Sequence, residues 1–184
     1  MLVADLSHYD GVDNERYPAA FRLAERLRTI ARAGSLTPGG YRLESALSCH
    51  RRPGHRRCPG HLVVARQEVP SEIIWRCSSC KDGGVITGWE SSHHDLRPAR
   101  LFEDAMLPFE VSDDELHLLR GVPGLDRESE RLIYSACRDQ GTIWLVAHVE
   151  ECEELVRKVA AAADRCGDRR RRQRLQQFVA RFGR

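Results

Sequence analysis

The sequence has little charge imbalance and almost no lysine. Its 184 residues include 29 basic and 27 acidic side chains, so the formal net charge is only +2. All of the basic residues except Lys81 and Lys158 are arginines. A net charge this small excludes a chain with global polyelectrolyte character, so attraction to a polyanion would have to come from a local cluster of charges.

Long apolar runs are also missing. No stretch of about 18 apolar residues occurs, which excludes a transmembrane helix. Residues 1–16 lack the basic start and apolar run of a signal peptide. The 41% hydrophobic and 30% charged residues are typical of a soluble globular protein. We therefore expect a cytoplasmic protein without membrane contact, built as one domain or one domain with an appendage.

Common catalytic motifs do not occur. The sequence has no H-E-x-x-H, no G-x-S-x-G and no Walker loop. The one feature that favours catalysis is the pair His93 and His94 before Asp95, which offers metal ligands or a proton carrier. Adjacent residues of a strand point to opposite faces, so two neighbouring histidines rarely reach one metal ion. A polar loop after Trp89 is the favoured interpretation.

The sequence divides into three parts, and the expected fold class is α+β. Residues 1–40 contain an N-terminal helix and a loop, residues 41–98 a β-rich metal-binding module, and residues 99–184 a helix-rich α/β domain. The N-terminal helix is predicted over 13–33, because its apolar residues recur at helical spacing. Asp13 or Asn14 would cap this helix, and Gly34 would end it.

Short apolar runs and turn residues predict the other elements. In the central part, strands are predicted over 41–49, 61–69, 72–77 and 85–89. In the last part, Ser112 and Glu115 have the spacing of a capping box that opens a helix. The predicted elements there are a strand at 109–111, a helix at 113–120, a helix at 125–140, a strand at 142–149, a helix at 150–166 and a helix after Gly167.

Four of the seven cysteines lie between positions 49 and 80. Cys77 and Cys80 form a C-x2-C pair that is followed by Gly83 and Gly84, which permit a tight turn. In a chain without an export signal, this pattern favours metal binding over disulfides. A buried dithiol and an iron–sulfur cluster are the less favoured alternatives.

The first half of the metal site has two candidate ligand sets. Cys58 is followed by Pro and Gly, and its partner is either Cys49, nine residues upstream, or His55, in a compact H-x2-C spacing. Thiolate sulfur is a better ligand than imidazole in a structural zinc site. We expect Zn²⁺ bound by Cys49, Cys58, Cys77 and Cys80, with His55 as the alternative ligand. Four protein ligands leave no open position, so such a site is structural and not catalytic.

The stretch CHRRPGHRRCPG…IIWRCSSCKDGGVITGW, within residues 49–90, resembles a zinc ribbon. In that class, two knuckles at the ends of β-hairpins hold one zinc ion. The stretch is similar to the zinc-ribbon segment of uncharacterised bacterial proteins, although the step from Cys49 to Cys58 is longer than the usual C-x2-C. The resemblance implies structural zinc but no single function, because zinc ribbons bind nucleic acids, contact proteins or only stabilise the fold.

Arginines are concentrated between the first two candidate ligands. Arg51, Arg52, Arg56 and Arg57 lie there without any acidic residue. Guanidinium groups bind phosphates in a bidentate manner, so the leading hypothesis is a non-enzymatic, regulatory protein that binds DNA or RNA. Trp75 and Trp89 would either stack on unpaired bases or form the small core of the module. The core is the favoured interpretation.

Two alternative functions remain open. Acidic clusters at 103–115 and 150–154 and an arginine run at 165–174 are consistent with a protein-interaction module that binds a partner or a second copy. The acidic clusters lie at predicted helix N-termini, where they complement the helix dipole. The arginine run opens the last helix, where the dipole disfavours cations, so it needs the Glu150 cluster, another chain or phosphate as a partner. A metal-dependent enzyme that uses His93 and His94 is the least favoured alternative.

Overall fold

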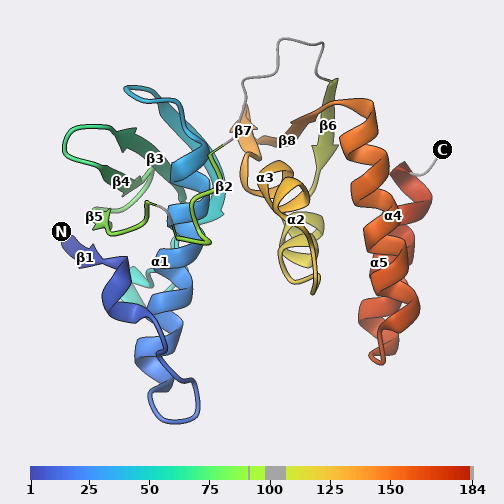
Figure 1. Cartoon of the computed structure of the whole chain (residues 1–184), viewed down its shortest axis with the longest axis horizontal. Helices are drawn as coiled ribbons and strands as arrows, with labels where there is room; N and C mark the ends of the chain where they lie inside the picture. The colour runs from blue at the N-terminus through green and yellow to red at the C-terminus, as the bar shows by residue number, and fades with distance from the viewer. Residues whose placement is uncertain (91, 98–106, 183–184) are drawn as a thin grey trace. The chain divides into compact units, whose positions relative to one another are not determined.

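The computed structural model describes residues 1–90, 92–97 and 107–182. The chain forms two compact units, Met1–Pro98 and Ala99–Arg184. Each unit contains helices and a β-sheet, which confirms the predicted α+β class (Figure 1). No helix among the described residues combines the length and the apolar character needed to cross a membrane.

The first unit is built on a five-stranded sheet. Its strands are β1 (Leu2–Asp5), β2 (Arg42–Ser48), β3 (His61–Gln67), β4 (Glu72–Cys77) and β5 (Gly83–Thr87). They lie in the order β1-β5-β4-β3-β2. Neighbouring strands are antiparallel except for β1, which pairs with β5 in parallel. Two 3₁₀ helices, Leu6–Tyr9 and Pro53–His55, occur in the connections.

Helix α1 (Pro18–Leu36) packs against β2, β3 and β4 (Figure 1). Alternate strand residues point toward this helix, as the two-residue period of a strand requires. The resulting core contains Leu27 and Ile30 from α1, together with Val64, Ile73 and Trp75 from the sheet. A Cβ atom at Gly34 would overlap Ile73 Cγ2, so only glycine allows this close approach of the helix to β4.

Both ends of α1 differ from the prediction. The helix begins at Pro18, because proline at the first helical position has its φ preset and lacks only an N–H that would have no partner. The Asp13 side chain accepts a hydrogen bond from Glu15 N at 2.9 Å in a local turn and does not cap the helix. Gly34 is buried within the last turn against Ile73, and the helix continues past it to Leu36.

Strand β1 was not predicted, because four residues are too few to show a pattern. Leu2–Asp5 becomes a strand by pairing with β5, with Leu2 opposite Gly84 and Asp5 opposite Thr87. A side chain at Gly84 would overlap the Leu2 carbonyl oxygen, so the strand can dock only beside glycine. This tertiary pairing places the N-terminal residues in the same sheet as the cysteine-bearing strands.

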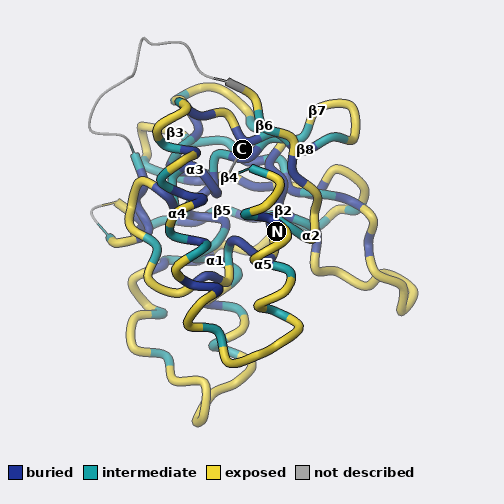
Figure 2. The backbone as a smooth tube through the Cα atoms, turned by 90° about the vertical axis from the view of Figure 1, so that its right-hand side faces the viewer, coloured by how far each residue is buried: buried dark blue, intermediate teal, exposed yellow. Residues whose placement is uncertain are grey.

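Within residues 107–182, the described part of the second unit, there are a three-stranded antiparallel sheet and four helices. The strands are β6 (Leu107–Val111), β7 (Cys137–Asp139) and β8 (Thr142–Ala147), with β8 between the other two. The helices are α2 (Asp113–Arg120), α3 (Arg127–Tyr134), α4 (Val149–Arg165) and α5 (Arg169–Phe182). Figure 2 shows buried and exposed segments alternating along the chain, as expected for helices that bury one face.

The predicted capping box of α2 is confirmed, whereas the predicted helix at 125–140 is too long. Ser112 Oγ accepts from Glu115 N at 3.1 Å, and Glu115 Oε2 accepts from Ser112 N at 2.8 Å. The helix at 125–140 ends at Tyr134, and Cys137–Asp139 instead forms β7. Gln140 and Gly141 both have positive φ, which permits the tight hairpin turn from β7 to β8. Pairing with β8 across this short turn thus overrides the helical pattern of residues 137–139.

The cap of α3 makes the second unit sensitive to acid. Asp126 accepts from Ser129 N at 3.1 Å and pairs with Lys158 Nζ at 2.6 Å. The hydrogen bond from Lys158 is the main reason that the pKa of Asp126 is lowered to about 2. A lowered pKa stabilises the folded state above pH 4, and this stability is lost as the pH falls toward 2.

We expect Asp126→Asn to flatten the acid dependence of unfolding. Because the Asp126 side chain is 53% exposed, the expected loss of unfolding free energy between pH 5 and pH 2 is only about 1 kcal/mol. The measurement is the difference in urea unfolding between the wild type and the variant at several pH values. Equal pH slopes in the two proteins would contradict the prediction.

Candidate metal centre

The four cysteine sulfurs of the first unit form one tight group. The sulfurs of Cys49, Cys58, Cys77 and Cys80 all lie within 4.8 Å of one another. Two of the separations, Cys49 to Cys80 and Cys58 to Cys77, are 3.7 Å. A tetrahedral zinc ion with Zn–S bonds of about 2.3 Å separates its sulfurs by about 3.8 Å. Two of the six separations match this value, and the whole group is compact enough for one metal ion to contact all four sulfurs.

Antiparallel pairing of the strands brings these cysteines together. Cys49 directly follows β2, and its backbone N–H donates to Gly60 O at 2.8 Å, just before β3. Cys77 ends β4 opposite Leu62 of β3, and Ser78 N donates to His61 O at 2.9 Å. The ends of two neighbouring hairpins thus converge, with one pair of cysteines on each.

Backbone amides surround the sulfurs. The donors to Cys49, Cys58 and Cys77 lie two residues further along the chain in each case: Arg51 N at 3.5 Å, Gly60 N at 3.4 Å and Ser79 N at 3.3 Å. Cys77 Sγ also accepts from Cys80 N at 3.4 Å. Such hydrogen bonds stabilise a thiolate relative to a thiol, so the turns on both sides of the site favour the form that binds metal.

The thiols titrate differently because their surroundings differ. Burial raises the pKa of Cys49 to about 12. Burial also raises the pKa of Cys77, but the amide hydrogen bonds from Cys80 and Ser79 outweigh it and lower the pKa to about 7. A group of four close thiolates without a cation would be strongly self-repelling. The arrangement is therefore suited to a positive ion at its centre.

An ion pair connects α1 to the turn between β4 and β5, which carries Cys80. Arg26 NH2 donates to Asp82 Oδ2 at 2.5 Å, and that carboxylate lies 4.0 Å from Cys49 Sγ. The Arg26 guanidinium also lies over the Trp75 ring, 4.9 Å from its centroid. Both partners of the ion pair are largely buried. Because residues that contact ligands restrict their movement, this contact holds the turn of Cys80 against α1.

The histidines do not join the cysteine group. His55 is exposed on the 3₁₀ turn and has a φ of 64°. His94 is buried, and burial lowers its pKa to about 3, so its imidazole is neutral. The centroid of its ring lies 3.7 Å from the centroid of the His93 ring. Among the described residues, the only cluster of metal-ligand side chains is that of the four cysteines.

Gly60 packs directly against the Cys77 sulfur. A Cβ atom at this position would lie 2.6 Å from Cys77 Sγ and 2.8 Å from Ser79 Oγ. We expect Gly60→Ala to displace the Cys77 sulfur and to weaken zinc binding about 10- to 100-fold, although all four cysteines remain. Competition with a chromophoric chelator measures this change. Gly167→Ala, where a Cβ atom would meet nothing within 4 Å and φ is not positive, is the control, and equal affinities of the two variants would contradict the prediction.

Residues 50–57 form a basic hairpin, here called the arginine hairpin. Its base is closed by Cys49 N donating to Gly60 O at 2.8 Å and Cys58 N donating to Arg51 O at 2.9 Å. At its tip, Gly54 and His55 have positive φ, and His55 N donates to Arg52 O at 3.1 Å. Arg51 and Arg52 lie on one arm, and Arg56 and Arg57 lie on the other.

The four guanidinium groups of the arginine hairpin are exposed. None of these groups forms an ion pair or hydrogen bond within the described part of the chain. Trp75 and Trp89 are only 2% and 0% exposed and belong to the core. Their predicted alternative role, stacking on unpaired bases, is therefore wrong, because the rings are covered by the protein.

The arginine run of the second unit has a structural explanation that sequence reasoning missed. Arg171 donates to Gly121 O, at the C-terminal end of α2. Arg172 donates to Cys166 O at 2.5 and 2.8 Å, at the C-terminal end of α4. Carbonyl groups at helix C-termini attract cations. These two arginines thus receive partners at the ends of other helices, which the linear sequence does not reveal.

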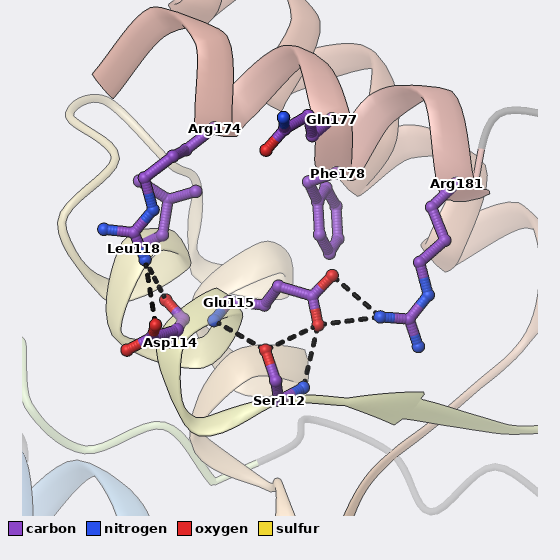
Figure 3. Close-up of a pocket in the computed structure, with 8 residues that line it drawn as sticks. All are labelled: Ser112, Asp114, Glu115, Leu118, Arg174, Gln177, Phe178 and Arg181. Atoms are coloured by element: carbon purple, nitrogen blue, oxygen red, sulfur yellow. Dashed lines mark hydrogen bonds and ion pairs between the residues drawn. The ribbon is translucent and has the colours of Figure 1, made fainter. Parts of the chain in front are cut away.

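A cavity of about 360 Å³ lies between α2 and α5 (Figure 3). Glu115 Oε1 and Oε2 each accept from Arg181 at 2.8 Å, and Arg174 lies 3.8 Å from Asp114 Oδ2. The two arginines on its wall are therefore already paired with acids of the same wall. Because the charges are balanced, we interpret these contacts as the docking of α5 on α2.

No protein-family model, curated protein or solved structure matches this chain. The assignment of function therefore depends on the cysteine group and on the arginine hairpin attached to it.

Proposed function

We propose that this protein is a non-enzymatic, zinc-ribbon-like nucleic-acid-binding protein with a regulatory role. Cys49, Cys58, Cys77 and Cys80 would hold one structural Zn²⁺, and the arginine hairpin would bind phosphate groups. The observation that carries the proposal is the group of four exposed arginine side chains, without a partner among the described residues, on a hairpin flanked by Cys49 and Cys58 of the cysteine group.

The spacing of the sulfurs supports a single ion. Clusters of two or four iron ions hold their cysteine ligands farther apart than one ion does, whereas these sulfurs lie within 4.8 Å. Zn²⁺ with four thiolates is the common closed structural site, and it stabilises the fold without taking part in a reaction. Because all four positions would be filled by protein, no place is left for a water molecule or substrate.

The position of the ligands supports a link between zinc and the arginine hairpin. Cys49 precedes the hairpin and Cys58 ends it, so an ion bound to both would hold the two arms together. A pre-ordered loop loses less conformational entropy when it binds. We therefore expect zinc-loaded protein to bind nucleic acid more tightly than zinc-free protein.

A different role of the arginines would be to neutralise the metal site, because zinc with four thiolates is a net anion. The variant Arg51→Ala/Arg52→Ala/Arg56→Ala/Arg57→Ala separates the two roles. If the arginines serve nucleic acid, the variant keeps its zinc affinity and loses nucleic-acid binding. If they only neutralise the site, zinc affinity falls instead.

The test is fluorescence anisotropy of labelled DNA and RNA with zinc-loaded protein at low and physiological salt. Each lost phosphate contact is expected to reduce the slope of log K against log salt by about 0.9 for duplex DNA. The matched control replaces four other exposed arginines, Arg22, Arg42, Arg169 and Arg170, by alanine, which removes the same charge. Absence of binding at low salt, or equal losses in both variants, would contradict the proposal.

A further inference from the structure

Helix α1 packs on one face of the sheet of the first unit (Figure 1), and we infer that the other face pairs with the same face of a second copy of the chain. Ile73 and Trp75 of β4 point toward α1 and are buried. Ile74, between them, points the other way and is 39% exposed. The face that carries Ile74 is here called the outer face. This inference is independent of the proposed nucleic-acid function, because it uses neither the cysteines nor the arginine hairpin.

An apolar row crosses the outer face at right angles to the strands. Val3 of β1 lies opposite Val85 of β5. Ile74, on the central strand β4, lies opposite Val85 on one side and Ala65 of β3 on the other. Residues directly opposite each other point to the same face of a sheet, so these side chains are contiguous. Val3 is 66% exposed, and Val85 and Ala65 are half-buried. Because a sheet face in water normally carries polar residues, such a row favours a contact surface.

Two charged residues flank Ile74 on the same strand. Glu72 lies two residues before it and Arg76 two residues after it, so all three are on the outer face. Neither Glu72 nor Arg76 has a side-chain hydrogen bond or ion pair within the described part of the chain. On β3, Glu72 lies opposite the amide of Gln67. Arg76 lies opposite Val63. The register of the sheet thus gives neither residue an opposite charge on this neighbouring strand.

A two-fold axis along the apolar row makes the outer face complementary to itself. Each residue of the row then meets the same residue of the second copy, as in other two-fold interfaces. The rotation reverses the strand direction, so Glu72 of one copy faces Arg76 of the other, and this ion pair forms twice. Sheets packed face to face lie about 10 Å apart, a gap that these two long side chains span together. The charges therefore favour a second copy over an unrelated protein.

The contact is small, so the expected dimer is weak. Four strands give the apolar row a length of about 14 Å. The row ends at Arg42, an exposed residue of β2 opposite Ala65, and the two copies of this charge would repel each other at the margin. We therefore expect a dissociation constant of about 10 to 200 µM, as for interfaces at the low end of the size range.

Sedimentation velocity of the zinc-loaded full chain, at concentrations from about 5 to 500 µM, tests the inference over the expected range. We expect the mean mass to rise from that of a monomer toward that of a dimer. Ile74→Thr keeps a β-branched side chain and is expected to raise the dissociation constant at least about fivefold. Val146→Thr, at a 37% exposed strand residue of the second unit, is the matched control. A monomer at every concentration would overturn the inference.

Charge reversal tests the two-fold arrangement. Arg76→Glu and Glu72→Arg each place like charges opposite each other twice, and each is expected to raise the dissociation constant at least about tenfold. The double variant Glu72→Arg/Arg76→Glu has opposite charges in both places again and is expected to dimerise like the wild type. Zinc content and circular dichroism verify that each variant is folded. A dimer that resists either single reversal, or a double variant that stays monomeric, would show that the inference is wrong and would leave the proposed function untouched.

Discussion

Cys77→Ser is expected to abolish tight zinc binding and to unfold the Met1–Pro98 unit. Cys77 is buried at the end of β4, with its sulfur 3.7 Å from that of Cys58. Structural zinc sites contribute about 10–16 kcal/mol in small zinc-binding peptides, which is as large as the total stability of a typical domain. The loss of one of four ligands removes much of this binding free energy. The ends of the strands around the site are then no longer stabilised in their folded positions.

Metal analysis, circular dichroism and limited proteolysis would measure the effect of Cys77→Ser. The matched control is Cys166→Ser, because Cys166 lies at the end of α4, outside the cysteine group. We expect the control to keep one zinc ion per chain and the wild-type resistance to protease. A Cys77→Ser protein that is zinc-free and equally stable would refute the structural role of the metal.

Gly34→Ala is expected to destabilise the first unit by up to about 2 kcal/mol, although alanine favours helices more than glycine does. The gain in helix propensity is at most about 1 kcal/mol. The new methyl group would overlap Cγ2 of Ile73, a fully buried and β-branched side chain that has little freedom to move. Overpacking of a core typically costs 1–3 kcal/mol, so we expect the steric effect to be larger.

A double-mutant cycle with Ile73→Ala separates these contributions. Ile73→Ala removes the atom that Gly34→Ala would overlap, so Gly34→Ala should be neutral or stabilising in that background. Gly167→Ala is the control, because a Cβ atom there would meet nothing within 4 Å. Urea unfolding is followed by tryptophan fluorescence in a Trp144→Phe background, so that the signal comes from Trp75 and Trp89 in the core of the first unit. An additive double mutant would contradict the steric explanation.

The arginine-rich segments of the two units differ in a way that composition does not show. In α5, Arg171 and Arg172 have carbonyl partners at the ends of α2 and α4. In the arginine hairpin, the guanidinium groups have no partner among the described residues. A surface charge without an internal partner is available for a ligand, whereas a paired charge mainly stabilises the fold. Arg169 and Arg170, at the start of α5, are also exposed, so the control variant that replaces them tests whether the C-terminal run contributes to binding.

The sequence by itself determined the features that depend on near neighbours. Strand β4 coincides with the predicted 72–77, because its pattern and the flanking turn are local signals. The capping box of Ser112 and Glu115 has its predicted hydrogen bonds, since it needs only two residues three apart. The C-x2-C pair likewise indicated a metal site, because two thiols at this spacing lie in one turn.

Only the tertiary structure decided what depends on pairing between distant segments. The register between the ends of β2 and β3 places the Cys49 sulfur 3.7 Å from that of Cys80 and leaves His55 exposed at the tip of the hairpin. Packing of α1 on the sheet buries Trp75, and pairing with β5 turns Leu2–Asp5 into a strand. In each case the arrangement is stabilised by contacts between residues far apart in the chain. A local pattern of residues therefore cannot predict the arrangement.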